Sequence, residues 1–171
     1  MVQYPRAIQT TVSGSVQLRA DDNGNYFLDF EEHGGLLVGR PISVQDGGKH
    51  DVIWLSSIIR DTGTALAVTS KYLDALEYAG FFHHQVRLHG IVGTCLLPAG
   101  PAEDLLALGR YRPCSVREIH ESFIYSTDQL RDGFDGVVKE VVERLAWGMA
   151  WSEDGLGDMV GNQLRKEGIG P

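Results

Sequence analysis

The chain has 171 residues, of which 43% are hydrophobic and 22% are charged, and its formal net charge is −8. This size and composition predict one globular domain, and no apolar run approaches the roughly 20 residues of a membrane span. The acidic balance disfavours nucleic-acid binding, which needs basic side chains to neutralise phosphates. Two cysteines are too few for a disulfide framework, and the N-terminus has no apolar secretory segment, so we expect a cytoplasmic protein.

The first half of the chain predicts strands. Residues 8–19 alternate between apolar and polar side chains, which is typical of a half-buried strand, and Gly14 in their middle indicates a bend of the kind found in small barrels. The Asn-Gly step in DDNGN predicts a hairpin turn to a second strand over residues 26–31. Two further strands are expected over residues 36–44 and 51–59, joined by a turn at Asp46–Gly48.

The middle of the chain alternates between short helices and longer strands. Residues 70–80 predict a helix capped by Ser70 and ended by Gly80. A long strand is expected from Phe81 to about residue 97, and a second short helix over residues 100–109. Residues 113–125 fit a helical face or a strand, and their β-branched and aromatic content favours the strand.

The last helix has the clearest pattern, and we expect it over residues 127–151. Ser126 and Gln129 match a capping box, and apolar residues recur at helical spacing from Leu130 to Met149. The Gly-rich tail, residues 152–171, is expected to be loosely ordered or docked by Leu156, Val160 and Leu164. The predicted organisation is one β-rich domain over residues 1–151, including this helix, followed by the tail.

Together these elements predict a mainly β fold with added helices, in the α+β class. A long first strand with a central glycine, and a helix before the penultimate strand, suit a small antiparallel OB-like barrel or a sandwich. The long amphipathic C-terminal helix would be packed against it.

Three of the six histidines lie close together in the stretch FFHHQVRLHGIVG. In an extended strand His83 and His89 share a face with Gln85 and Arg87 but lie about 20 Å apart, and His84 points the opposite way. Ligands of one zinc ion must all lie about 2 Å from it, so no two of these histidines can share a metal within one strand. We therefore expect no metal or cofactor here; the alternative is a metal site that combines one of these histidines with His120, Glu118 or Cys114, brought in by folding.

Evidence for catalysis is weak in the sequence. Cys114 precedes His120 by six residues, and neither a strand nor a helix brings two side chains at that spacing together. Cys95 with a distant histidine stays open, as does an enzyme of unknown type with a non-local His/Cys site. No nucleotide-binding, serine-hydrolase or zinc-protease motif is present.

The pattern favours a non-enzymatic interaction module, a subunit or adaptor that binds a protein partner or a second copy of itself. Trp147 and Trp151 lie on one side of the last helix, and tryptophan is enriched at interface hot spots. Alternatively, both rings pack on the barrel. A second function is OB-like binding of single-stranded nucleic acid through a basic, aromatic surface. Its candidate residues are His83, Arg87, His89, Arg110, Tyr111 and Arg112.

Overall fold

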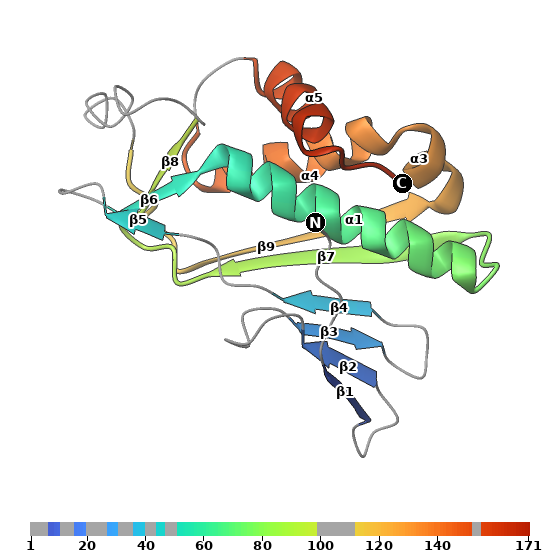
Figure 1. The fold of residues 1–171 in the computed structure, drawn as a ribbon. Coiled ribbons are helices and arrows are strands. Elements are labelled where there is room, and N and C mark those ends of the chain that lie inside the picture. The colour runs from blue at the N-terminus through green and yellow to red at the C-terminus, as the bar shows by residue number, and fades with distance from the viewer. Residues whose placement is uncertain are drawn as a thin grey trace. The chain divides into compact units, whose positions relative to one another are not determined.

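The computed structural model describes residues 7–10, 16–19, 27–30, 36–39, 44–46, 51–98, 112–151 and 155–171 (Figure 1). The chain divides into two compact units, Met1–Ile42 and Ser43–Pro171. The expected single domain over residues 1–151 stays a prediction. No helix in the described part of the chain is long and apolar enough to cross a membrane.

The first unit contains a four-stranded antiparallel sheet in sequence order. The predicted single strand over residues 8–19 is wrong, because the two ends of this segment pair with each other and Ile8 lies opposite Leu18. The predicted hairpin across the Asn-Gly turn is confirmed, since the second and third strands are antiparallel neighbours. The strands are β1 (Ala7–Thr10), β2 (Val16–Arg19), β3 (Phe27–Phe30) and β4 (Leu36–Gly39).

The second unit contains two small sheets. One has the order β5-β6-β8, in which β5 and β6 are antiparallel and β6 and β8 are parallel. The other is a two-stranded antiparallel ribbon of β7 and β9. Val52 and Ile53 of β6 and all three residues of β8 are buried, which places this sheet in the core. The strands are β5 (Val44–Asp46), β6 (Asp51–Trp54), β7 (Phe81–His89), β8 (Cys95–Leu97) and β9 (Glu118–Ser126).

The longest element is helix α1 (Leu55–Ala75), which replaces the second half of the strand expected over 51–59 and begins before the short helix expected over 70–80. The Asp-Thr-Gly segment at 61–63 has a composition typical of a turn. Gly63 instead lies inside the helix, where a Cβ would come within 2.6 Å of Leu164 Cδ2. This glycine therefore permits close helix packing rather than a turn.

The long strand expected over residues 81–97 is also wrong. The chain turns after His89, where Gly90 and Gly93 adopt φ values of 72° and 81°. Such positive angles suit glycine, which has no Cβ to clash with the backbone. The side chain of Thr94 donates a hydrogen bond to the carbonyl of Ile91 across this turn. The two halves of the segment consequently join different sheets.

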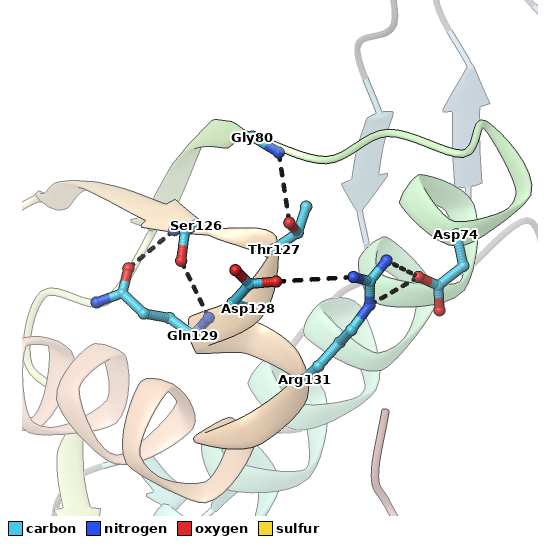
Figure 2. Close-up of polar contacts among 7 residues, drawn as sticks. All are labelled: Asp74, Gly80, Ser126, Thr127, Asp128, Gln129 and Arg131. Carbon is cyan, nitrogen blue, oxygen red and sulfur yellow. Dashed lines mark hydrogen bonds and ion pairs between the residues drawn. The ribbon is translucent and has the colours of Figure 1, made fainter.

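Residues 113–125 contain a strand, β9, as favoured, and the next segment starts with the predicted capping box (Figure 2). Ser126 Oγ accepts a hydrogen bond from the backbone N–H of Gln129, whose side chain accepts one from the N–H of Ser126. The single helix expected over 127–151 is broken at Gly133. It forms α3 (Thr127–Asp132) and α4 (Phe134–Gly148).

The described part of the predicted tail is docked. Helix α5 (Leu156–Glu167) buries Leu156, Val160 and Leu164. It packs against α1 and α4, and these two helices also pack against each other. Figure 1 shows the three helices on the same side of the β7–β9 ribbon, and α3 and α4 contact β9. The core of this unit therefore lies between the helices and the inner face of the ribbon.

The expectation of a mainly β, OB-like barrel or sandwich is wrong. Among the described residues, more lie in helices than in strands, and the strands form three open sheets instead of a closed barrel. The parallel pair of β6 and β8 is also foreign to an antiparallel barrel. The physical reason is that the apolar run after β6 has helical spacing and buries Leu55, Ile58, Ile59 and Leu66 along one side of α1.

Candidate functional site at the end of α4

The C-terminal end of α4 exposes a large aromatic ring. The side chain of Trp147 is 77% exposed, although its neighbours Ala146 and Met149 are almost completely buried. Trp151, just after the helix, is partly exposed. The alternative in which both rings pack on a barrel is therefore wrong, because there is no such barrel among the described strands and Trp147 lies at the surface. The residues that anchor α4 in the core therefore lie on a different side of the helix from Trp147.

A hollow of about 490 Å³ lies beside Trp147. This volume is within the range of pockets that hold small ligands. One wall comes from three residues on successive turns of α4 and from Trp151, which follows the helix. The other wall comes from the first turn of α5. The lining residues are Lys139, Glu143, Trp147, Trp151, Gly155, Leu156, Gly157 and Asp158.

Of the charged side chains that line this hollow, two are paired with each other and the third is not. Lys139 Nζ lies 3.7 Å from Glu143 Oε1, so these two charges compensate each other. The lysine side chain also lies over the start of α5, where a Cβ on Gly157 would be 2.8 Å from Nζ. Asp158, in the first turn of α5, forms no ion pair with any residue of the described segments. The hollow thus contains one uncompensated carboxylate beside two indole rings.

The second candidate surface is the outer face of the β7–β9 ribbon. The structure places His83, Gln85, Arg87 and His89 there, all exposed, as the strand pattern predicted. Arg87 Nε lies 2.9 Å from Glu118 Oε1, so its charge is compensated. Arg112 is exposed ahead of β9, whereas Arg110 and Tyr111 lie outside the described residues.

His84 occupies the inner face of the ribbon, as expected. Its ring centroid lies 6.3 Å from that of Phe123, and its Nε2 is buried without a hydrogen-bond partner. Burial, with a smaller contribution from the nearby charge of His83, lowers the pKa of His84 to about 4. The imidazole is therefore neutral at pH 7. In the described segments no three His, Cys, Asp or Glu side chains are grouped closely enough to hold a metal ion.

Neither cysteine resembles an activated nucleophile. Cys95 and Cys114 are both buried and unpaired. Burial raises the pKa of the Cys95 thiol, which disfavours the reactive thiolate. Cys114 lies in the segment before β9 with its backbone N–H donating to the carbonyl of Thr94 at 2.7 Å, while His120 is exposed on the outer face of the ribbon. The structure therefore gives no support to a local Cys–His pair.

Sequence interpretation found the two tryptophans of the hollow and missed its charged residues. Lys139, Glu143, Trp147 and Trp151 recur every four residues, so their common side was visible in the sequence. Asp158 was not predictable in the same way, because its position depends on how α5 docks against α4.

No protein-family model, curated protein or solved structure matches this chain.

Proposed function

We propose that residues 43–171 form a protein-interaction module, a subunit or adaptor, whose partner docks on Trp147 and the hollow beside it. The observation that carries the proposal is the 77% exposure of Trp147. Tryptophan is enriched among the few residues that dominate binding energies, and such residues act best next to a pocket. A ring left in water at the rim of a hollow fits this role.

The fold does not depend on the Trp147 ring. Helix α4 is anchored by a different side, where Val138, Val141, Val142 and Leu145 are at most 1% exposed. Replacing an exposed side chain away from the core generally changes stability by about 0.5 kcal/mol or less. Binding and folding are thus separable at this position, which makes the proposal testable.

The chemistry of the hollow favours a partner that inserts a basic side chain. Indole faces attract ammonium and guanidinium groups. The Asp158 carboxylate is available as a counter-charge because Lys139 is already paired with Glu143. In the sequence, the interval between Trp151 and Asp158 contains two further acidic residues and no basic ones. An arginine of the partner suits these groups best, since its planar guanidinium stacks on rings and bonds to carboxylates.

The test uses ¹⁵N-labelled protein and short peptides as probes. The chain has three tryptophans, so their indole N–H signals can be followed separately. We expect a Gly-Arg-Gly peptide at millimolar concentration to shift the Trp147 indole signal and the Asp158 amide. Gly-Glu-Gly and Gly-Leu-Gly peptides should leave both in place. A response to the glutamate peptide, or equal responses to all three, would contradict a basic anchor.

Matched variants separate the site from general surface effects. W147A and D158N should each reduce the response to the arginine peptide, with the fold intact by circular dichroism. I124A is the control, because Ile124 is 71% exposed but lies on the ribbon, away from the hollow. If I124A reduces the response as much as W147A does, the hollow is not the binding site.

Nothing in the described part of the chain favours the nucleic-acid alternative. It relied on an OB-like barrel that the described strands do not form. Of its basic residues, Arg87 is paired with Glu118. The interaction module is therefore the function that we put forward.

A further inference from the structure

Strand β7 has an unpaired edge among the described strands, because β9 is its one neighbour there. The ladder between them is continuous over nine residue pairs, from Phe81 opposite Ser126 to His89 opposite Glu118. β7 contains no proline and no lysine, two residues that commonly protect an edge strand against pairing. A strand of this length with an open edge is a template for another strand.

The hydrogen bonds at the two ends of the ladder show which backbone groups point outwards. Gly90 donates its N–H to Arg117 O, and Thr127 donates its N–H to Gly80 O. In an antiparallel pair, residues that exchange backbone bonds alternate with residues that do not. The even-numbered residues of β7 therefore bond to β9. The odd-numbered residues direct their N–H and C=O groups to the open edge.

One of these outward-pointing carbonyl groups already accepts a hydrogen bond from its own chain. Tyr78 Oη donates a hydrogen bond to Phe81 O at 2.6 Å, which closes the start of the edge. The open stretch therefore runs from His83 to His89. Gln85 lies within this stretch, and its side chain is exposed on the outer face.

Burial of the inner face points to an additional strand beside β7. On β9 the inner apolar side chains of Ile119, Phe123 and Tyr125 are buried, and the inner Glu121, opposite Val86, is partly buried. On β7 the corresponding side chains are all only partly buried, although they lie in the same layer. The burial of the inner-face side chains therefore decreases from β9 towards the open edge of β7. The partly buried residues are Phe82, His84, Val86 and Leu88.

We propose that the open edge of β7 pairs with the same edge of a second copy of this chain, antiparallel and centred on Gln85. Gln85 would face Gln85 of the other copy, and His83 would face Arg87, all as hydrogen-bonded pairs. The His83–Arg87 pair occurs twice by symmetry, so the three pairs provide about six backbone hydrogen bonds, two for each pair. The two ribbons would become one four-stranded sheet with two-fold symmetry.

This register is self-complementary on the inner face. A two-fold axis at Gln85 places Phe82 beside Leu88 of the other copy, and His84 beside Val86. All four are the partly buried residues of β7, so pairing would cover them in one step. A single two-stranded ribbon is marginal by itself, and a wider sheet gains stability from more pairs.

The absence of acidic residues on β7 also favours pairing between two copies of this strand. The chain carries a formal net charge of −8, yet β7 contains no acidic residue. Two copies can therefore approach at this edge without carboxylates facing each other. Arg87, the single arginine or lysine of the strand, is paired with Glu118 of its own ribbon.

The first experiment measures the dimerisation constant of the full chain by analytical ultracentrifugation over a range of concentrations. Q85P removes an outward N–H without touching the bonds to β9, and proline is tolerated at an open edge. We expect it to weaken dimerisation about tenfold or more, since two bonds on the axis are lost. A wild-type chain that stays monomeric up to about 1 mM would overturn the proposal, as would a dimer unaffected by Q85P.

The second experiment tests the register by charge and does not require proline. Q85K and Q85E each place like charges opposite one another on the axis, so each should dimerise more weakly than wild type. Mixing the two should restore dimers, because opposite charges then face each other. I124K, which adds the same charge on β9, is the control. Equal weakening by I124K and Q85K, or no recovery on mixing, refutes this register.

The outcome is independent of the proposed function. W147A should leave the dimerisation constant unchanged, because Trp147 lies on α4. If W147A abolishes the dimer and Q85P does not, the two copies meet at the hollow and the β7 proposal fails. A dimer that depends on Gln85 supports it whether or not the hollow binds arginine.

Discussion

Acidification should destabilise the second unit through His84. The pKa of this histidine is lowered from 6.5 to about 4, chiefly by burial, with His83 as the smaller cause. In the unfolded chain the imidazole takes up a proton near pH 6.5, whereas the folded protein does so only near pH 4. The unfolded state therefore binds more protons between these values. Stability is complete above pH 6.5 and falls as the pH decreases towards 4.

The size of the effect follows from the shift in pKa. One pKa unit corresponds to 1.36 kcal/mol, so the lowering from 6.5 to about 4 costs at most about 3 kcal/mol at pH 4. The His84 side chain keeps some solvent contact, which makes this an upper limit. A loss of about 3 kcal/mol is large compared with the 5–15 kcal/mol that stabilises a typical domain.

The assay is urea unfolding at several pH values from 7.5 to 4.5, for the wild type and for H84L. Leucine keeps an apolar group beside Phe123 and cannot titrate. Acids and histidines that do not interact with His84 titrate equally in both proteins, so the difference between the two curves reports His84 and its smaller coupling to His83. We expect this difference to change by up to about 1.4 kcal/mol per pH unit below pH 6.5. H120Q, at an exposed histidine of β9, is the control.

Parallel curves for wild type and H84L would refute this reasoning, and so would an equal effect of H120Q. Either result would mean that the His84 imidazole is not kept neutral by its surroundings.

Three further changes test the packing and capping described above, each by urea unfolding at pH 7. G63A should destabilise by about 1–3 kcal/mol, because its Cβ would meet Leu164 Cδ2 at 2.6 Å; an unchanged midpoint would contradict the close packing of α1 on α5. G136A, with no atom within 4 Å of its Cβ, should instead stabilise by about 0.5–1 kcal/mol, and a loss would show hidden crowding. S126A should cost about 1 kcal/mol because Gln129 loses its capping partner, whereas wild-type stability would show that the cap is dispensable.

The sequence predicted best where a local signal determines the structure. The capping box at Ser126 and the hairpin between β2 and β3 are examples, since each depends on neighbouring residues alone. The outward row of His83, Gln85, Arg87 and His89 was predicted because strand geometry fixes which side chains share a face.

The predictions from sequence failed where contacts between residues far apart in the chain determine the structure. Gly63 and its polar neighbours are typical of a turn, but contact with Leu164 and Ile169 from the C-terminal segment gives the glycine a place inside α1. The barrel was inferred from the order of the expected strands, including the one over 51–59 whose second half is helical, and it is consequently wrong. Similarly, the exposure of Trp147 and the nearness of Asp158 depend on the docking of α5, which the sequence alone does not specify.

The parallel pairing of β6 with β8 has a consequence for how the chain folds. Val52 pairs with Cys95, more than forty residues away, and α1 and β7 lie between them in the sequence. Bringing such distant residues together costs loop entropy before any pairing energy is gained, so contacts of this kind slow folding. By contrast, α3, α4 and β9 are close in sequence and contact one another. We expect this C-terminal group to form early, and the β5-β6-β8 sheet to close in the rate-limiting step.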